Sequence, residues 1–189
     1  MYLEEQNSDL NDEINDLICL SNDLTIIEDR LAVKLKAWDL IPEPKINWVE
    51  PTSSVANGIS GVYEEKGDYK VALEWVLLAL KAREIEPDAS IFCDAGAIYF
   101  ELGDMDNAYK YFQFAYNELR YQPFSYRDRK YWQFYKQRKE ELDPKKKIKS
   151  NIRCFQTTSK LSLRSSEKGR ADLQERAPAV PPAKPVRRP

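Results

Sequence analysis

The first forty residues carry apolar side chains at the three- and four-residue spacing of amphipathic helices. One stripe predicts a helix that begins after a polar cap at Ser21 or Asn22. Its apolar members are Leu24, Ile27, Leu31, Leu35 and Trp38. A more acidic stripe before it consists of Leu10, Ile14, Leu17 and Ile18. The proline-containing segment 41–52 is predicted to be an extended linker, because the residue before a proline avoids the helical conformation.

A shift of the sequence by 36 residues uncovers an internal repeat. Eight residues of the window 53–88 recur in 89–124, whereas average residue usage gives roughly two coincidences. The matching pairs are Ser54 and Ser90, Tyr63 and Tyr99, Glu65 and Glu101, Gly67 and Gly103, Asp68 and Asp104, Ala72 and Ala108, Ala79 and Ala115, and Pro87 and Pro123. The repeat therefore defines two similar structural units in the middle of the chain.

The repeated residues suit two pairs of antiparallel helices. Gly67 and Gly103 can end a first helix in the left-handed conformation, which glycine adopts without steric cost. Asp68 and Asp104 follow them, and each carboxylate can cap the second helix by accepting from its free N–H groups. Small residues lie seven apart on one face of each second helix, where they let two helix axes approach closely; these are Ala72, Ala79, Ala108 and Ala115. The second helices are expected to stop at the repeated prolines, Pro87 and Pro123.

The stretches 61–72 and 97–108 resemble tetratricopeptide repeats, a family of stacked helical pairs. The first copy matches the signature at Tyr63, Gly67, Ala72, Ala79 and Pro87. The second copy matches it at Tyr99, Gly103, Ala108, Phe112, Ala115 and Pro123. The resemblance covers about 53–124 and implies an all-α fold, a solenoid of antiparallel helix pairs that the N-terminal helices flank.

A second shift of 36 residues reaches a third segment, 125–142, which predicts a single helix that caps the array. Its start is expected near Ser125 and Asp128, and Asp143 followed by a proline ends it. The expected organisation is therefore an acidic N-terminal region with the linker at 1–52, helical repeats with the capping helix at 53–143, and a tail at 144–189.

The charge of the chain is divided sharply between the tail and the rest. Residues 144–189 hold 13 Lys or Arg against three acids, so the tail carries +10, while residues 1–143 carry −12. The tail has few apolar residues and many prolines, which predicts disorder because it cannot bury enough surface to offset its ordering entropy. The acidic body favours a basic partner, and the basic tail favours RNA or an anionic membrane.

The residue inventory excludes most catalytic chemistry. The chain has no histidine, and its three cysteines, Cys19, Cys93 and Cys154, form neither a disulfide framework nor a metal-binding spacing. No phosphate-binding glycine loop or nucleophile elbow is present. We therefore expect no enzyme, no cofactor and no metal site. The chain has no run of 18 apolar residues and no secretory signal, which predicts a cytoplasmic protein without a transmembrane segment.

The resemblance also implies a binding surface, because the first helices of tetratricopeptide pairs line a groove for a peptide or a partner helix. By this resemblance the groove residues are Asn57, Gly61, Glu64, Ser90, Cys93, Ala97, Phe100, Arg129, Gln133 and Lys136. From the residues alone, Cys93 is expected to be a small buried or half-buried residue. The segment 120–138 interleaves aromatic and basic side chains, which suits a capping helix, a protein contact or a nucleic-acid contact.

Together these features predict a non-catalytic module that binds one protein or peptide partner in the groove. Chains of this size and acidity resemble bacterial adaptors, secretion chaperones and immunity proteins that block a toxin. The alternative is a scaffold that its basic tail tethers to RNA or to an anionic membrane. A comparison of the full chain with a 1–143 truncation separates the two.

Overall fold

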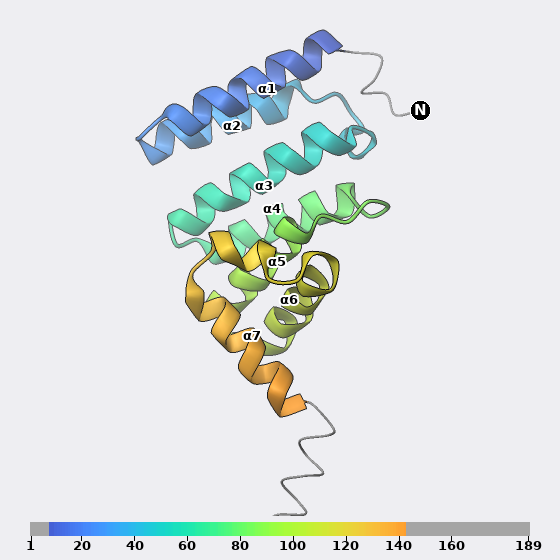
Figure 1. Cartoon of the computed structure of the whole chain (residues 1–189). Helices are drawn as coiled ribbons and strands as arrows, with labels where there is room; N and C mark the ends of the chain where they lie inside the picture. The colour runs from blue at the N-terminus through green and yellow to red at the C-terminus, as the bar shows by residue number, and fades with distance from the viewer. Residues whose placement is uncertain (1–7, 143–189) are drawn as a thin grey trace, which may run out of the picture. The chain divides into compact units, whose positions relative to one another are not determined.

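The structure, a computed structural model, describes residues 8–142, and this part of the chain is entirely helical (Figure 1). Its α-helices are α1 Ser8–Asp23, α2 Ile27–Leu40, α3 Val49–Glu65, α4 Tyr69–Ala82, α5 Ala89–Glu101, α6 Met105–Leu119 and α7 Arg129–Leu142. Two short 3-10 helices are η2 Lys45–Asn47 and η3 Gln122–Tyr126. The predicted all-α class is confirmed for these residues, whereas the predicted tail, 144–189, lies outside them.

Residues 8–138 belong to one compact unit, and the features discussed below belong to it. None of the helices within residues 8–142 combines the length and the apolar character needed to span a lipid bilayer.

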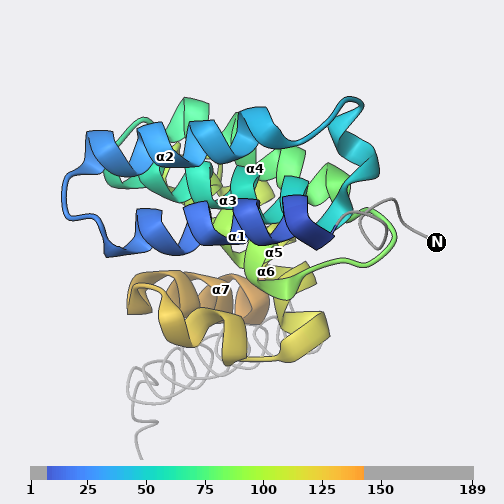
Figure 2. The same ribbon diagram turned by 90° about the horizontal axis from the view of Figure 1, so that it is seen from above.

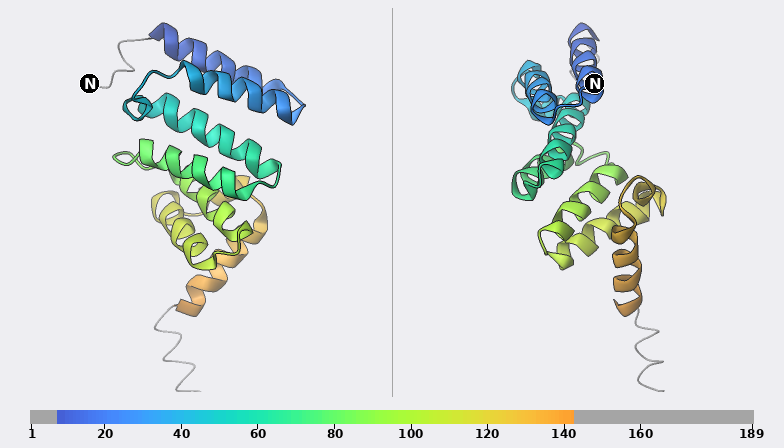
Figure 3. Two further views of the ribbon diagram at one scale, coloured as in Figure 1. Left: turned by 180° about the vertical axis from the view of Figure 1, so that it is seen from behind. Right: turned by 90° about the vertical axis from the view of Figure 1, so that its left-hand side faces the viewer.

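The first six helices form three consecutive antiparallel pairs (Figure 1), and Figure 2 shows α1 and α2 side by side. The pair α1–α2 packs through α2 on α3, and the pair α3–α4 packs through α4 on α5 (Figure 3). The two N-terminal helices predicted to flank the repeats thus make a further pair of the same kind. The result is a repeat-like arrangement in which each pair contacts its neighbours in the sequence.

The turn inside each repeated pair has the predicted chemistry. Gly67 and Gly103 have φ values of 78° and 81°, in the left-handed region. The N–H of Asp68 donates to the carbonyl of Tyr63 at 2.9 Å, and its carboxylate accepts from the N–H of Val71. The turn after α5 has the same arrangement: the N–H of Asp104 donates to the carbonyl of Tyr99, and its carboxylate accepts from the N–H of Asn107. Each turn therefore ends one helix with a Schellman motif and caps the next one directly.

The core consists of three clusters, and α5 contributes to two of them. The repeated alanines are fully buried, as predicted from their spacing; they are Ala72, Ala79, Ala108 and Ala115. One face of α5 packs on α3 and α4 through Ile91, Ala95 and Ile98. Its other face, with Cys93 and Ala97, packs on α6, η3 and α7. Helix α5 is consequently covered on two sides.

The predicted cap of α2 is wrong. Helix α1 continues through Ser21 and Asn22 to residue 23. Helix α2 has Ile26 at its N-cap position, and this side chain makes no capping hydrogen bond. The two polar side chains instead accept from the buried Nζ of Lys34, at 2.8 Å from Ser21 and 3.3 Å from Asn22. Their polar atoms satisfy an ammonium group that burial would otherwise leave unpaired.

Two further boundaries differ from the prediction. The linker 41–52 is not extended throughout, because it contains η2 and α3 begins at Val49. Pro51 lies in the first turn of α3, where the N–H that proline lacks has no acceptor within the helix. The prolines expected to stop α4 and α6 lie beyond helices that have already ended, and α6 stops at Leu119, before the positive φ of Arg120. The start of α7 agrees with the prediction, since the carboxylate of Asp128 accepts from the N–H of Lys130.

Candidate functional site

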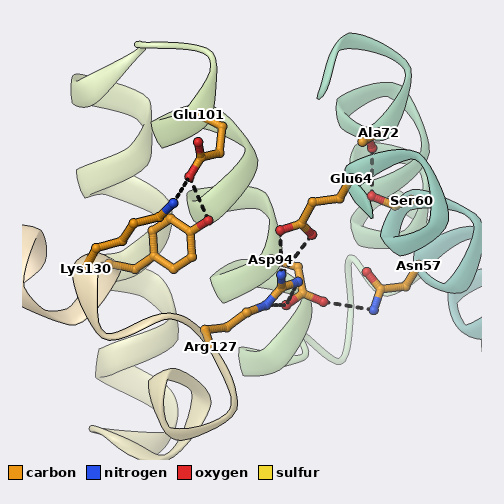
Figure 4. A network of polar contacts seen from close by, with 9 residues as sticks. Asn57, Ser60, Glu64, Ala72, Asp94, Glu101, Arg127 and Lys130 are labelled. Atoms are coloured by element: carbon orange, nitrogen blue, oxygen red, sulfur yellow. Dashed lines mark hydrogen bonds and ion pairs between the residues drawn. The ribbon is translucent and has the colours of Figure 1, made fainter. Parts of the chain in front are cut away.

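A polar network joins α3, α5 and the segment between η3 and α7 (Figure 4). The guanidinium group of Arg127 donates from Nη1 to both carboxylate oxygens of Glu64, at 2.7 and 2.8 Å. Its Nε and Nη2 lie 2.9 and 2.6 Å from Oδ1 of Asp94. The side-chain amide of Asn57 donates to the other oxygen of Asp94 at 3.0 Å. One arginine thus bridges the first helices of both repeated pairs.

The elements that hold this network differ in character. Glu64 and Asp94 are fixed on helices, whereas Arg127 lies on extended backbone with φ −115° and ψ 167°. Arg127 is one of two residues between η3 and α7, and buried rings flank this connection, Phe124 in η3 and Tyr131 in α7. The connection therefore presents an arginine to two helices.

Partial burial strengthens the network electrostatically. The side chains of Arg127, Glu64 and Asp94 are only 22%, 17% and 18% exposed. Burial alone would lower the pKa of Arg127, but the charge of Asp94 and the hydrogen bonds and charge of Glu64 raise it above its usual value. Arginine therefore keeps its charge here, and two carboxylates at reduced solvent exposure share one cation.

A second polar contact lies nearby, at the start of α7 (Figure 4). Glu101 accepts from Nζ of Lys130 at 2.7 Å and from the hydroxyl of Tyr131 at 2.8 Å. The hydrogen bond from Lys130 is the main cause that lowers the pKa of Glu101, and burial is the main cause that raises the pKa of Tyr131. This contact fixes α7 to the end of α5.

Some of the predicted groove residues come together and others do not. Asn57 and Glu64 belong to the network, and Gly61 and Ser90 are exposed on α3 and α5. The predicted Cys93 and Ala97 have no exposed surface and belong to the core instead. Burial, followed by the charge of the neighbouring aspartate, raises the pKa of the Cys93 thiol to about 12. The expectation of a buried cysteine is confirmed, and neither side chain is accessible to a partner.

The remaining predicted groove residues lie toward α7. Phe100 is half-buried and makes edge-on contacts with the rings of Tyr131 and Phe134, at centroid distances of 5.4 and 5.1 Å. Arg129, Gln133 and Lys136 are exposed on α7. The ten predicted residues therefore do not form one continuous exposed surface, because the rings of η3 and α7 cover part of α5.

The aromatic side chains of segment 120–138 mainly build this cover. Phe124, Tyr131 and Tyr135 are at most 5% exposed and pack around Phe112 of α6. Tyr126 in contrast is 83% exposed. The capping interpretation of the buried rings is confirmed.

Sequence reasoning missed two members of the network, Asp94 and Arg127. The repeat gave no indication of them, because the 36-residue shift places Gly58 opposite Asp94 and Ile91 opposite Arg127. The interleaving of aromatic and basic side chains in segment 120–138 was the only available signal for Arg127, and it did not identify the acids 33 and 63 residues away.

Within residues 8–142, no three carboxylate or cysteine side chains are placed to hold a metal ion. A scan against protein-family models finds no match, and a search of curated proteins finds no similar sequence. The arrangement of side chains must therefore support any functional assignment by itself.

Proposed function

We propose that the chain is a non-catalytic protein-interaction module that binds a protein or peptide partner along α3 and α5, the first helices of its repeated pairs. The observation that supports it is the Arg127 network. On this face two helices already hold an arginine from the connection between η3 and α7, through side-chain contacts of the kind that a bound peptide would make.

The repeat supports the finer form of this proposal, a tetratricopeptide-like solenoid. Two identical glycine–aspartate turns and the buried alanines follow the pattern by which the family stacks its helical pairs. In such an array the exposed Gly61 and Ser90 belong to the binding face. An adaptor, a secretion chaperone or an immunity protein of the bacterial cytoplasm fits a small module of this kind.

The charge of residues 1–143, −12, favours a basic partner. We expect capture of such a partner to weaken as salt is added, because exposed charges are screened at high ionic strength. Binding that is insensitive to salt would contradict a basic partner.

The test is capture of partners from the native cell by full-length protein, with cross-linking to locate them. In the test variant, Gly61→Arg and Ser90→Arg place two cations on the proposed face. A Cβ at Gly61 meets nothing within 4 Å, and Ser90 is exposed, so the fold should tolerate both. The matched control, Gln113→Arg with Asn117→Arg, adds the same charges to exposed positions of α6.

We expect the test variant to lose a partner that the control retains, with cross-links on α3 and α5. Equal retention by both variants contradicts the proposed face. The +10 charge of residues 144–189 supports one rival, a scaffold tethered to RNA or anionic membrane. In that case the 1–143 truncation loses all binding, and nucleic acid or lipid accompanies the full chain.

A further inference from the structure

We infer that Glu64 and Asp94 form a guanidinium-binding site that Arg127 fills in cis, and that an arginine side chain of the partner takes its place on binding. The part of the inference that concerns the partner rests on the proposed function. The guanidinium site itself rests on the geometry of the network alone.

The site matches the shape of a guanidinium group rather than a point charge. Asp94 receives the Nε and Nη2 side of Arg127, while Glu64 receives Nη1 (Figure 4). Three nitrogen atoms in one plane thus have acceptors on two helices. A lysine ammonium has a single nitrogen and cannot contact both carboxylates in this way.

One of the two acceptors, Asp94, is oriented independently of Arg127. Both carboxylates come from helices, and the amide of Asn57 orients Asp94 by its separate hydrogen bond. Without a cation, however, two carboxylates would face each other in a partly buried site, which is unfavourable because like charges repel. The site is therefore expected to exchange one cation for another rather than to remain empty.

The side chain of Arg127 can leave without disturbing the core. Its backbone lies in the connection between η3 and α7, and its N–H donates locally to the carbonyl of Phe124 at 3.2 Å. The core contacts of that region are made by Phe124 and Tyr131, on either side. A rotation of one long side chain exposes the carboxylates, so an incoming arginine need not unfold η3 or α7.

Arg127 thereby acts as an internal competitor. A ligand for a site that is open only part of the time binds more weakly, in proportion to the open fraction. Replacing Arg127 with a neutral residue should raise the affinity for an external guanidinium group by about tenfold or more, as for a site open at most about a tenth of the time.

The experiment uses full-length protein and N-acetyl-arginine amide as the probe. Binding is followed by nuclear magnetic resonance at the side-chain amide of Asn57 and the backbone amide of Asp94, which report on this site. The proteins are wild type, Arg127→Ala and Arg127→Gln, with Arg138→Ala as the control that removes an arginine from an exposed ion pair with Asp106. N-acetyl-lysine amide tests the preference for a guanidinium group.

We expect both neutral variants at residue 127 to bind the arginine probe at least about tenfold more tightly than wild type and Arg138→Ala. The lysine probe should bind more weakly, and adding Asp94→Asn to Arg127→Ala should abolish the gain. Equal affinities in wild type and variants overturn the inference, as does equal binding of the two probes. If neither neutral variant is folded, Arg127→Lys replaces them, and the absence of any gain over wild type overturns it.

The outcomes separate this inference from the proposed function. If the probe does not bind while Gly61→Arg with Ser90→Arg still abolishes partner capture, the guanidinium exchange is wrong and the binding face stands. If the probe binds but partner capture is independent of α3 and α5, the site stands and the proposed function is wrong.

Discussion

Gly96 of α5 lies directly against the ring of Phe112 of α6, so Gly96→Ala tests the packing of the second repeated pair. A Cβ at this position would lie 2.6 Å from Cδ1 and 2.7 Å from Cε1 of Phe112. Ordinary contacts of a Cβ begin at 3.4 Å, so the ring would have to withdraw by about 0.8 Å. Phe112 has no exposed surface, and the centroids of the Phe124 and Tyr131 rings lie 5.3 and 5.9 Å from the centroid of its ring, so neighbouring rings restrict this movement.

Two opposing effects determine the magnitude. Overpacking a well-filled core costs about 1–3 kcal/mol. In the interior of a helix, alanine is more stabilising than glycine by about 1 kcal/mol. Gly61→Ala is the matched control, because a Cβ there meets nothing within 4 Å and only the helix preference acts. We expect Gly61→Ala to raise the free energy of unfolding by about 1 kcal/mol. We expect the free energy of unfolding of Gly96→Ala to be about 2 kcal/mol lower than that of Gly61→Ala.

The assay is urea denaturation of both full-length variants and wild type, followed by far-ultraviolet circular dichroism. Unchanged slopes of the transition allow the midpoints to be compared as free energies of unfolding. If Gly96→Ala is as stable as Gly61→Ala, α5 and α6 are not packed as the structure shows, and the reasoning from Phe112 fails.

Three further predictions concern the cap, the buried thiol and one carboxylate. Asp104→Ala should lower the urea midpoint in the same assay, because it removes the N-cap of α6; an unchanged midpoint would contradict the capping role. In a Cys19→Ser, Cys154→Ser protein, Cys93 should react with a thiol reagent only as fast as the protein unfolds, since its thiol is buried and its pKa is raised to about 12; rapid labelling of the folded protein refutes this. The lowered pKa of Glu101 means that its carboxylate stabilises the fold above the pKa of the unfolded chain and loses this effect as the pH falls through the folded value. The difference in urea midpoint between wild type and Glu101→Gln should therefore be smaller at about pH 3 than at about pH 7. A difference that does not change with pH would contradict this role of Glu101.

Local chemistry could be predicted from the sequence wherever one residue type has one structural use. The left-handed turns at Gly67 and Gly103 followed from the conformational freedom of glycine and from their repetition. The caps at Asp68 and Asp104 followed from their place after these turns. These residues act within a few positions of the chain, so their neighbours in the sequence were sufficient.

The same reasoning was less successful where a residue serves a distant partner. Ser21 has the character of an N-cap, but the ammonium group of Lys34 takes its hydroxyl oxygen. Cys93 and Ala97 were placed in the groove because the array was expected to leave the first helix of each pair open. The rings of η3 and α7 cover them instead. Arg127 likewise joins acids 33 and 63 residues away, a pairing that no local pattern contains.

The two-sided burial of α5 has a consequence for synthesis on the ribosome. The chain emerges from its N-terminus, so α5 and α6 are complete before Phe124, Tyr131 and Tyr135 arrive to close the cluster around Phe112. During this interval the nascent chain exposes an aromatic surface that the finished protein buries, and such surfaces promote aggregation. A premature stop after α6 would make this exposure permanent, so the cell would be expected to degrade such a fragment rather than accumulate it as a smaller working module.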